Sequence, residues 1–184
     1  CKESSKHVKV ALSGDGADEL FSGYRRHSAE YFARNNPVKS KIIYLLKPLW
    51  SLLPKSRESK LSDTFRKLNR FAEGYSNSLE KRYINWSSIL TIEEISKLLK
   101  STTQFSSFNF RLSTSNDFNS VLFNDSQFLL QGDMLRKVDL MSMKNSLEVR
   151  VPFLDYELYE FGFSIPSYFK IDANGTKKII KDAY

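Results

Sequence analysis

The sequence predicts a mainly α-helical chain with one buried strand near the N-terminus, followed by a helical bundle. The strand is predicted at Val8–Leu12, a nearly all-apolar run of the kind that is covered on both faces in a parallel sheet. After this run, apolar residues recur at helical spacing over most of the chain, between stop signals made of Pro, Gly and Asn. A parallel sheet needs neighbours, and no second strand is convincing. We therefore expect the chain to be one part of a larger α/β domain.

The first helix is expected directly after the strand and its glycine turn, over 17–34, and the Asn-Asn-Pro sequence at 35–37 ends it. Two later helices follow residues that are able to cap them. Ser76–Ser78 precede a helix that reaches Ser88, and Asp155 precedes another. The remaining helices are expected over 38–53, 63–74, 91–100, 117–130, 134–145, 156–163 and 175–184.

Local signals refine these bounds. The sequence Thr91-Ile92-Glu93-Glu94 has the spacing of a capping box. Gly132 is expected to end one helix and Asp133 to cap the next. Leu147–Val151 alternates apolar and charged side chains, which predicts an extended segment. Residues 101–115 mix Ser, Thr and Phe without a clear period, so they predict no element.

The composition is typical of a soluble globular protein. A chain of 184 residues is long enough for one domain with a core, and 41% hydrophobic with 27% charged residues is an ordinary balance. No apolar stretch is long enough to cross a bilayer, so no membrane partner is expected. The single cysteine, Cys1, excludes an internal disulfide and fits a reducing compartment. The expected location is therefore cytoplasmic.

Positive charge is concentrated in residues 34–70, where ten Lys or Arg stand against two acidic residues, a local charge of +8. Such a block indicates either an anionic partner such as nucleic acid or a solvated helical face. The lysines are interleaved with apolar residues at helical spacing, which favours the solvated face. Nucleic acid is therefore not the expected partner.

The most informative motif is the segment Ser13–Glu19, between the strand and the first helix. A strand, a tight glycine turn and a helix start form the layout in which backbone N–H groups bind a phosphate. This turn also carries Asp15, Asp18 and Glu19, whose charges would repel a phosphate. Mg²⁺ resolves the conflict, because one or two carboxylates plus substrate phosphates typically hold it. The motif predicts nucleotide chemistry, although each acid alone also fits a plain helix cap.

Three motifs in this order resemble the asparagine synthetase family, which are glutamine-dependent enzymes. The first is Ser13–Tyr24, in which Ser22 stands where the family usually has Gly. The second runs from Asp133 to Asp155, and the third is Lys177–Lys181. The resemblance implies that residues 1–184 are a single partial domain, the C-terminal part of a synthetase domain with the adenine-nucleotide alpha-hydrolase fold.

The resemblance also implies roles for five residues. In the family, the side-chain carboxylate of aspartate attacks the α-phosphorus of ATP to give a β-aspartyl-adenylate and pyrophosphate, and ammonia from glutamine then displaces AMP. Ser13 and Gly14 are implied to bind ATP, and Asp18 is implied to bind Mg²⁺. Asp15 and Lys177 are the implied catalytic residues. Asp15, at a position where many members have Glu, is implied to act near the adenylate or the ammonia proton. Lys177 is implied to hold the pyrophosphate.

The same resemblance implies that other parts of the enzyme lie outside this chain. The N-terminal glutaminase domain, the Ser-Gly-Gly-rich pyrophosphate-binding loop and a second metal carboxylate are expected upstream of Cys1. We therefore expect the chain to carry half of an ATP/Mg²⁺ site and to be inactive by itself. A homodimer is left open.

Two alternatives also stay open at this point. A related amidotransferase that acts on a sugar acid or a peptide carboxylate would carry the same loop, and the substrate pocket is not readable from the sequence. A non-catalytic helical binding module that uses the basic block at 34–70 would need no ATP.

Overall fold

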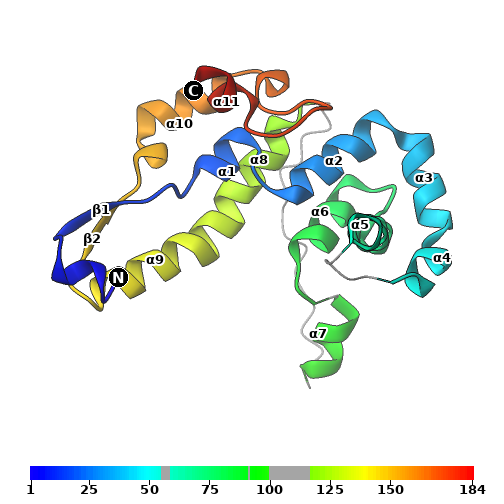
Figure 1. Ribbon diagram of the computed structural model, residues 1–184, viewed down its shortest axis with the longest axis horizontal. Coiled ribbons are helices and arrows are strands. Elements are labelled where there is room, and N and C mark those ends of the chain that lie inside the picture. The colour runs from blue at the N-terminus through cyan, green and yellow to red at the C-terminus, as the bar shows by residue number, and fades with distance from the viewer. Residues whose placement is uncertain (55–58, 91, 100–116) are drawn as a thin grey trace. The chain divides into compact units, whose positions relative to one another are not determined.

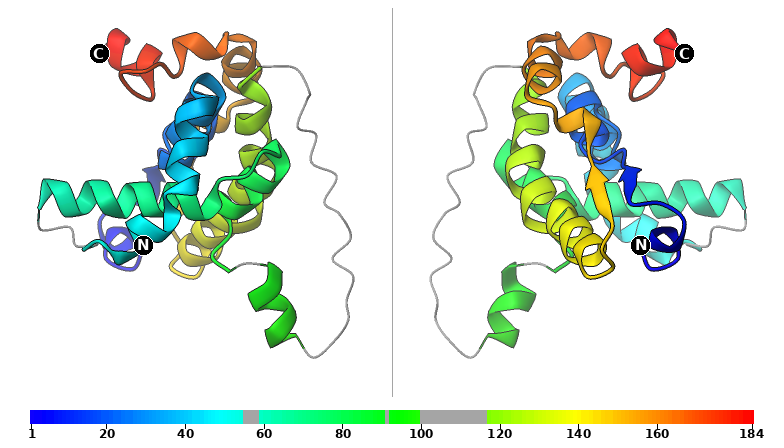
Figure 2. Two further views of the ribbon diagram at one scale, coloured as in Figure 1. Left: turned by 90° about the vertical axis from the view of Figure 1, so that its right-hand side faces the viewer. Right: turned by 90° about the vertical axis from the view of Figure 1, so that its left-hand side faces the viewer.

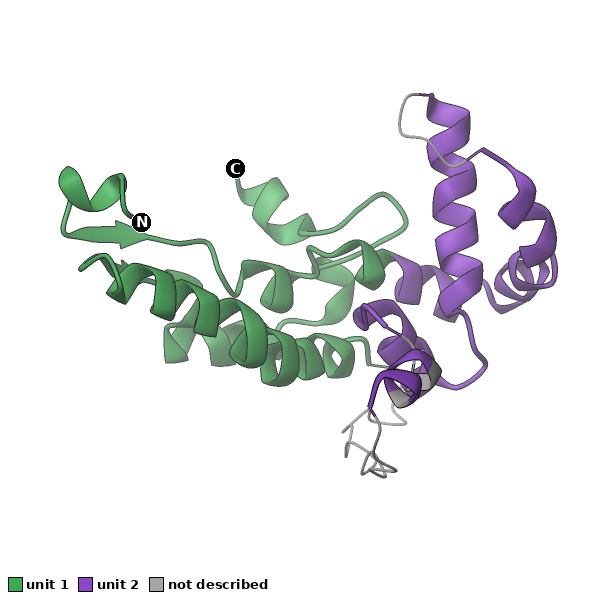
Figure 3. Ribbon diagram, turned by 90° about the horizontal axis from the view of Figure 1, so that it is seen from below, with its two compact units in different colours: residues 1–28, 111–184 green, residues 29–110 purple. Residues whose placement is uncertain are grey.

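The structure is a computed structural model that describes residues 1–54, 59–90, 92–99 and 117–184 (Figure 1). The chain divides into two compact units, unit 1 with residues 1–28 and 111–184 and unit 2 with residues 29–110 (Figure 3). The predicted mainly helical fold class is confirmed, and a two-stranded parallel sheet accompanies the helices. The division into units does not test the prediction of a single partial domain, which stays a prediction.

The sheet of unit 1 pairs strand β1 (Val10–Leu12) with strand β2 (Glu148–Arg150) in parallel. The Ser13 N–H donates to the Arg150 carbonyl at 2.9 Å and continues the pairing by one residue. The prediction that the chain lacks a second strand is therefore wrong, since the segment expected to be extended at 147–151 is the partner. Pairing between segments so far apart leaves no trace in local periodicity, so the pattern alone missed it.

The prediction that the strand is buried is also wrong within the described residues. Leu12 is 74% exposed and Val10 is 40% exposed, because the described helices do not cover both faces of the two-stranded sheet. The apolar run of β1 indicates that the strand is suited to burial, but its actual burial depends on the elements that pack against it.

The single helix expected over 17–34 is broken in two. Helix α1 (Ala17–Phe21) ends at Ser22, which adopts a left-handed conformation with φ +64°, and helix α2 (Arg25–Asn35) begins after Gly23 and Tyr24. The Ser22 N–H donates to the Asp18 carbonyl and closes α1. A helix ended by a left-handed residue is a common C-terminal arrangement, and the apolar spacing on either side concealed it.

Helices α8 (Asn119–Asp125) and α9 (Leu135–Met143) are joined by the π-helical segment η2 (Ser126–Met134), so that the three form one long helical run, coloured lime to yellow in both views of Figure 2. The predicted break at Gly132 and Asp133 is therefore wrong. Asp133 pairs with Lys137 one turn later at 2.7 Å, which is a contact within a helix and not a cap.

Two helices of unit 1 follow β2. Helix α10 (Tyr156–Ser164) confirms the predicted cap, because the Asp155 carboxylate accepts from the N–H groups of Glu157 and Leu158. Helix α11 (Lys178–Ala183) begins later than the predicted residue 175. The described residues of unit 1 also include short 3₁₀ turns, one before β1 and two after β2: η1 (Ser4–Lys6), η3 (Pro152–Leu154) and η4 (Ser167–Phe169).

The core of unit 1 lies where α1 meets the C-terminal elements. Leu20, Phe21 and Ile165 are buried, and partly buried hydrophobic residues from η3, α10 and α11 pack against them: Phe153, Tyr159, Phe163, Ile179 and Ile180. This packing holds the end of the chain against the helix that follows the glycine turn.

Unit 2 begins within α2, and its described residues form five further helices. The helix expected over 38–53 is split at Leu46, two residues before Pro48. Predictions for Thr91 and for residues 101–115 lie outside the described residues. The helices of the unit are α3 (Pro37–Leu45), α4 (Lys47–Leu52), α5 (Lys60–Gly74), α6 (Leu79–Ser87) and α7 (Ile92–Leu98).

Candidate functional site

The predicted ATP-binding residues lie on the turn after β1. The Ser13 hydroxyl donates to the Asp15 carboxylate at 2.5 Å, and both side chains are partly exposed. Gly14 is exposed, and a Cβ atom there would meet nothing within 4 Å, so its backbone faces open space. Gly16 has φ +90°, and a Cβ atom at that position would overlap the Leu154 side chain. A glycine is therefore required there, both by the backbone and by the packing.

The other two predicted residues lie side by side. The Lys177 ammonium is 2.6 Å from the Asp18 Oδ1 atom, and about a third of each side chain is exposed. The predicted metal ligand and the predicted pyrophosphate-binding cation therefore form an ion pair between α1 and the residue that precedes α11. Their sequence separation is large, so tertiary packing creates this pair.

The backbone fixes the position of Lys177. This residue has φ +54°, a left-handed conformation that is uncommon outside glycine. Its N–H donates to the Phe21 carbonyl at 3.1 Å, and the Lys178 N–H donates to the Lys170 carbonyl at 3.0 Å. Ile179 and Ile180 then pack against the core next to Phe21. The side chain of Lys177 therefore leaves a rigid backbone and meets the first turn of α1.

Gly23 is a site residue that the sequence reasoning did not single out. A Cβ atom at Gly23 would overlap the Asp18 Oδ1 atom and the Lys177 Cε atom. Its N–H also donates to the Asp18 carbonyl at 2.9 Å. Its place in the Ser13–Tyr24 motif was the available signal, but only the structure gives the reason for a glycine.

Comparisons with known proteins identify the family of this chain. The family model described as asparagine synthase matches residues 1–184. The chain belongs to the asparagine synthase family. It is 33% identical to asparagine synthetase [glutamine-hydrolyzing] 1 of Bacillus subtilis (strain 168), in an alignment that covers 99% of this chain and 29% of that protein. It is 32% identical to a putative asparagine synthetase [glutamine-hydrolyzing] of Mycobacterium bovis, over 99% of this chain and 28% of the relative.

A third relative, asparagine synthetase [glutamine-hydrolyzing] 3 of Bacillus subtilis, is 31% identical over the whole of this chain and 25% of its own length. The chain thus spans between a quarter and a third of the length of these asparagine synthase family relatives. No solved structure was found to match it. In the described ranges, no helix is both long enough and apolar enough to cross a bilayer.

In this family member, residues that follow Asp18 along the chain belong to a largely buried polar network. The Tyr24 hydroxyl donates to the buried Glu19 carboxylate at 2.7 Å, and burial together with this hydrogen bond raises the pKa of Tyr24. The buried Asp125 carboxylate accepts from Arg26 at 2.7 Å and lies 2.6 Å from His27 Nε2. These contacts attach the segment after Gly23 to helix α8.

The charge of Asp125 is stabilised by its partners. Burial by itself would raise the pKa of this carboxyl, but the hydrogen bond and charge of His27, with those of Arg26, outweigh burial and hold the pKa below its usual value. The Tyr24 N–H lies 3.4 Å from His27 Nδ1, and His27 Nε2 lies 2.6 Å from the Asp125 carboxylate. His27 is therefore a buried member of this polar network.

The donor set for a metal is small. Within the parts of the chain that the structure describes, no three His, Cys, Asp or Glu side chains gather into a metal-binding group. Asp18 is a partly exposed carboxylate, and the missing side chain at Gly23 leaves it room. One carboxylate with substrate phosphates is a binding mode that Mg²⁺ uses, so the residues present fit this ion.

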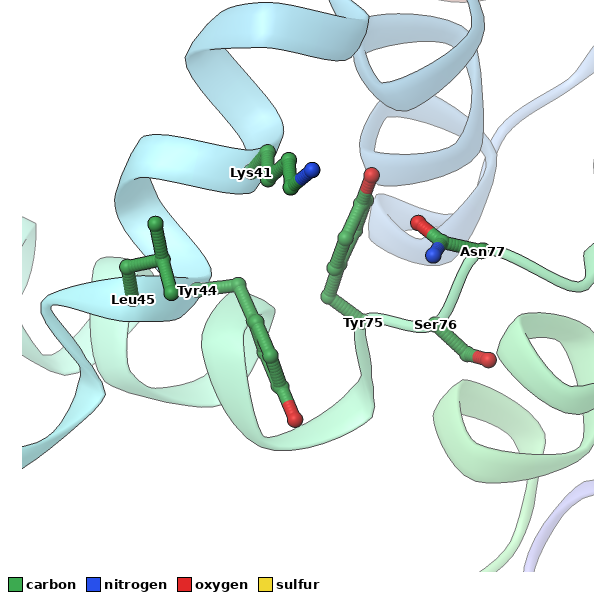
Figure 4. Close-up of a pocket in the computed structure, with 6 residues that line it drawn as sticks. All are labelled: Lys41, Tyr44, Leu45, Tyr75, Ser76 and Asn77. Atoms are coloured by element: carbon green, nitrogen blue, oxygen red, sulfur yellow. The ribbon is translucent and has the colours of Figure 1, made fainter.

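Unit 2 holds a pocket of about 250 Å³, drawn in Figure 4. In this view the Lys41 side chain points toward Tyr75, whose ring lies 5.6 Å from that of Tyr44. None of the predicted site residues lines this pocket, so it does not belong to the predicted nucleotide site. Its lining residues are Lys41, Tyr44, Leu45, Tyr75, Ser76 and Asn77.

Proposed function

We propose that this chain is part of an asparagine synthetase (glutamine-hydrolysing), which converts aspartate, ATP and ammonia drawn from glutamine into asparagine, AMP and pyrophosphate. The observation that carries the proposal is the 2.6 Å contact between Asp18 and Lys177. These are the two residues that family resemblance assigns to the metal and to the pyrophosphate, and the fold brings them to one place. The chain covers only part of the family relatives, so the whole activity is a proposal.

In this proposal the turn after β1 binds the nucleotide. The exposed backbone of Gly14 and the hydroxyl of Ser13 lie against ATP. Asp18 holds Mg²⁺, which when bound supplies positive charge to the phosphates. Lys177 takes the β- and γ-phosphates and stabilises the charge that develops as pyrophosphate leaves.

Asp15 is proposed to act next to the reacting carboxylate. The aspartate carboxylate attacks the α-phosphorus of ATP, and ammonia then attacks the adenylate carbonyl and releases AMP. Asp15 would orient the adenylate or accept the proton that ammonia loses. The hydrogen bond from the Ser13 hydroxyl orients the Asp15 side chain, which is shorter than the Glu that many family members have there.

The rest of the proposal concerns the surroundings of the site. We propose that residues 1–184 belong to one synthetase domain with the adenine-nucleotide alpha-hydrolase fold. The pyrophosphate-binding loop, the second metal carboxylate and the glutaminase domain would come from sequence outside this chain. A cytoplasmic location rests on the single cysteine, and a homodimer remains a prediction.

The test measures aspartate-dependent pyrophosphate release from ATP, and asparagine formation with glutamine or ammonia, in the full-length protein. Asp18→Asn and Lys177→Met are each expected to reduce both rates at least about a hundredfold, since each removes charge stabilisation from the transition state. Asp182→Asn is the matched control, because Asp182 pairs with the neighbouring Lys178 at 3.0 Å and lies outside the proposed site.

Unchanged rates in both site variants would contradict the proposal. Pyrophosphate release that responds to a sugar acid or a peptide carboxylate, and not to aspartate, would replace it with a related amidotransferase activity. No ATP-dependent turnover with any carboxylate would favour a binding module.

A further inference from the structure

Helices α3 and α4 of unit 2 expose a series of apolar side chains. Val38 is 71% exposed, Leu45 is 66% exposed and Leu52 is 84% exposed. Successive members of the series are three or four residues apart, which is the spacing of one side of a helix. We call these exposed residues the apolar row: Val38, Ile42, Leu45, Leu49 and Leu52.

The opposite side of α3 faces the interior of unit 2. Ser40 lies two positions from Val38 and from Ile42, which is about 200° around a helix, and it is fully buried. Helices α3 and α4 both pack against α5 (Figure 1). The Trp50 indole N–H also donates to the Ile43 carbonyl at 2.8 Å and ties α4 to α3. The described packing of the two helices therefore leaves the apolar row uncovered.

Positive charge without a partner flanks the apolar row. Lys39, Lys41 and Lys47 are exposed, and none of them forms an ion pair with an acidic side chain of the described residues. Asp63, on the neighbouring helix α5, is already paired with two basic residues of its own helix. The basic block at 34–70 thus presents lysines and aliphatic side chains to the solvent together.

We propose that α3 and α4 bind the surface of an anionic lipid membrane, with the apolar row inserted between the headgroups and the flanking lysines against their negative charge. Helices that carry Lys beside exposed Leu, Ile and Val bind membrane surfaces in this way. Contact at the surface requires no spanning helix, and the described residues contain none. This property is separate from the proposed function, which concerns unit 1.

The combination of side chains favours lipid over the other anionic partners. Lys is depleted from protein–protein interfaces, whereas it is abundant on helices that lie on membranes. Nucleic acid would pair with the lysines, but bases stack on aromatic rings and gain little from exposed aliphatic side chains. A lipid surface satisfies the charge and the apolar area at the same time.

The test is cosedimentation of the full-length protein with vesicles of phosphatidylcholine mixed with phosphatidylglycerol, and with vesicles of phosphatidylcholine alone. Each lysine near an anionic surface strengthens binding about fivefold, so the three lysines together give a preference of about a hundredfold for the anionic vesicles. Lys39→Gln/Lys41→Gln/Lys47→Gln is expected to lose most of this preference. Ile42→Ser/Leu45→Ser, which keeps the charge, is expected to weaken binding at least about tenfold.

The control variants make the same changes in unit 1. Lys2→Gln/Lys9→Gln/Lys144→Gln removes the same charge from exposed lysines, and Leu140→Ser/Met143→Ser removes two exposed apolar side chains from α9. Both controls are expected to bind anionic vesicles as the wild type does. All these substitutions are at exposed positions, so the variants are expected to fold, and circular dichroism checks this.

Absence of wild-type binding to anionic vesicles would overturn the inference, because it would mean that other parts of the full-length protein cover the apolar row. Unchanged binding by Ile42→Ser/Leu45→Ser, or an equal loss in the controls, would also overturn it. Displacement of the protein from the vesicles by a short DNA duplex at equal charge concentration would assign the lysines to nucleic acid instead.

Discussion

A side chain on Gly23 would occupy the position of the Asp18 Oδ1 atom. The same side chain would overlap the Lys177 Cε atom, so Gly23 provides the space in which the ion pair forms. This relationship explains why a glycine follows the end of α1 without any need for a left-handed backbone, since Gly23 is not among the residues with positive φ.

Substitution of Gly23 is expected to damage the site more than the fold. In Gly23→Ala, the overlapping atoms belong to the outer parts of two side chains, which can move aside at a cost of about 1–2 kcal/mol in stability. Binding of Mg²⁺-pyrophosphate should weaken at least about tenfold, because Asp18 and Lys177 are pushed from their positions. Calorimetry and urea unfolding measure the two effects separately.

The control for this prediction is Gly132→Ala, at a glycine where a Cβ atom would meet nothing within 4 Å. It should leave pyrophosphate binding unchanged. Wild-type binding by Gly23→Ala would show that the space at Gly23 does not matter to the site.

Ser22→Gly is expected to stabilise the protein. Ser22 has φ +64° and is fully buried, and its hydroxyl has no hydrogen-bond partner among the described residues. A non-glycine residue pays about 1–2 kcal/mol in this conformation, and the buried hydroxyl adds about 1 kcal/mol or more. Glycine loses about 0.5–1 kcal/mol of this gain, because it increases the conformational entropy of the unfolded chain. The net gain in the free energy of unfolding is therefore about 1 kcal/mol or more.

Urea unfolding measures this gain, and Ser146→Gly separates its two sources. Ser146 also has a left-handed backbone, φ +52°, but it is exposed. Its substitution should therefore give the smaller gain that comes from the backbone alone. Equal gains at the two positions would mean that the buried hydroxyl of Ser22 contributes nothing.

Stability is expected to rise with pH above neutrality because of Lys170. This lysine is fully buried, and its ammonium donates to Asn119 Oδ1 at 2.8 Å. Burial lowers the pKa of Lys170 to about 8, from an unfolded value of 10.5. Between these values the unfolded chain binds a proton that the folded chain does not, so the free energy of unfolding increases with pH. The expected increase is about 2 kcal/mol between pH 7.5 and 9.5.

Urea unfolding at these two pH values measures the slope. Lys170→Met should remove it, whereas Lys178→Met should retain it, because the hydrogen bond to Asp182 raises the pKa of the partly exposed Lys178. A slope that persists in Lys170→Met would assign the pH dependence to other groups.

Loss of the Asp125 carboxylate is expected to cost about 3–5 kcal/mol, because its removal leaves Arg26 and the buried His27 without their shared acceptor. Asp133→Ala, on the same helical run, is the control. Its pair with Lys137 is exposed and contributes less than about 1 kcal/mol. Similar costs for Asp125→Ala and Asp133→Ala in urea unfolding would contradict the importance assigned to the buried network.

The sequence predicted the helical fold class because apolar spacing and caps act within a few residues. The cap at Asp155 is confirmed on those grounds. The sequence pattern did not predict the continuous helix through Gly132 or the break at Ser22. At both places the local pattern is compatible with a continuous helix and with a break, and tertiary contacts select one of the two.

The candidate site residues were identified from the motif Ser13–Tyr24 and from Lys177, because the types of side chain present can be read directly from the sequence. The sequence alone therefore determined which groups are available: an acidic glycine turn and a distant cation. Tertiary structure alone decided that Asp18 and Lys177 touch and that β2 pairs with β1. Such contacts join segments far apart in the chain, and they form because burial of Leu20, Phe21 and their partners brings those segments together.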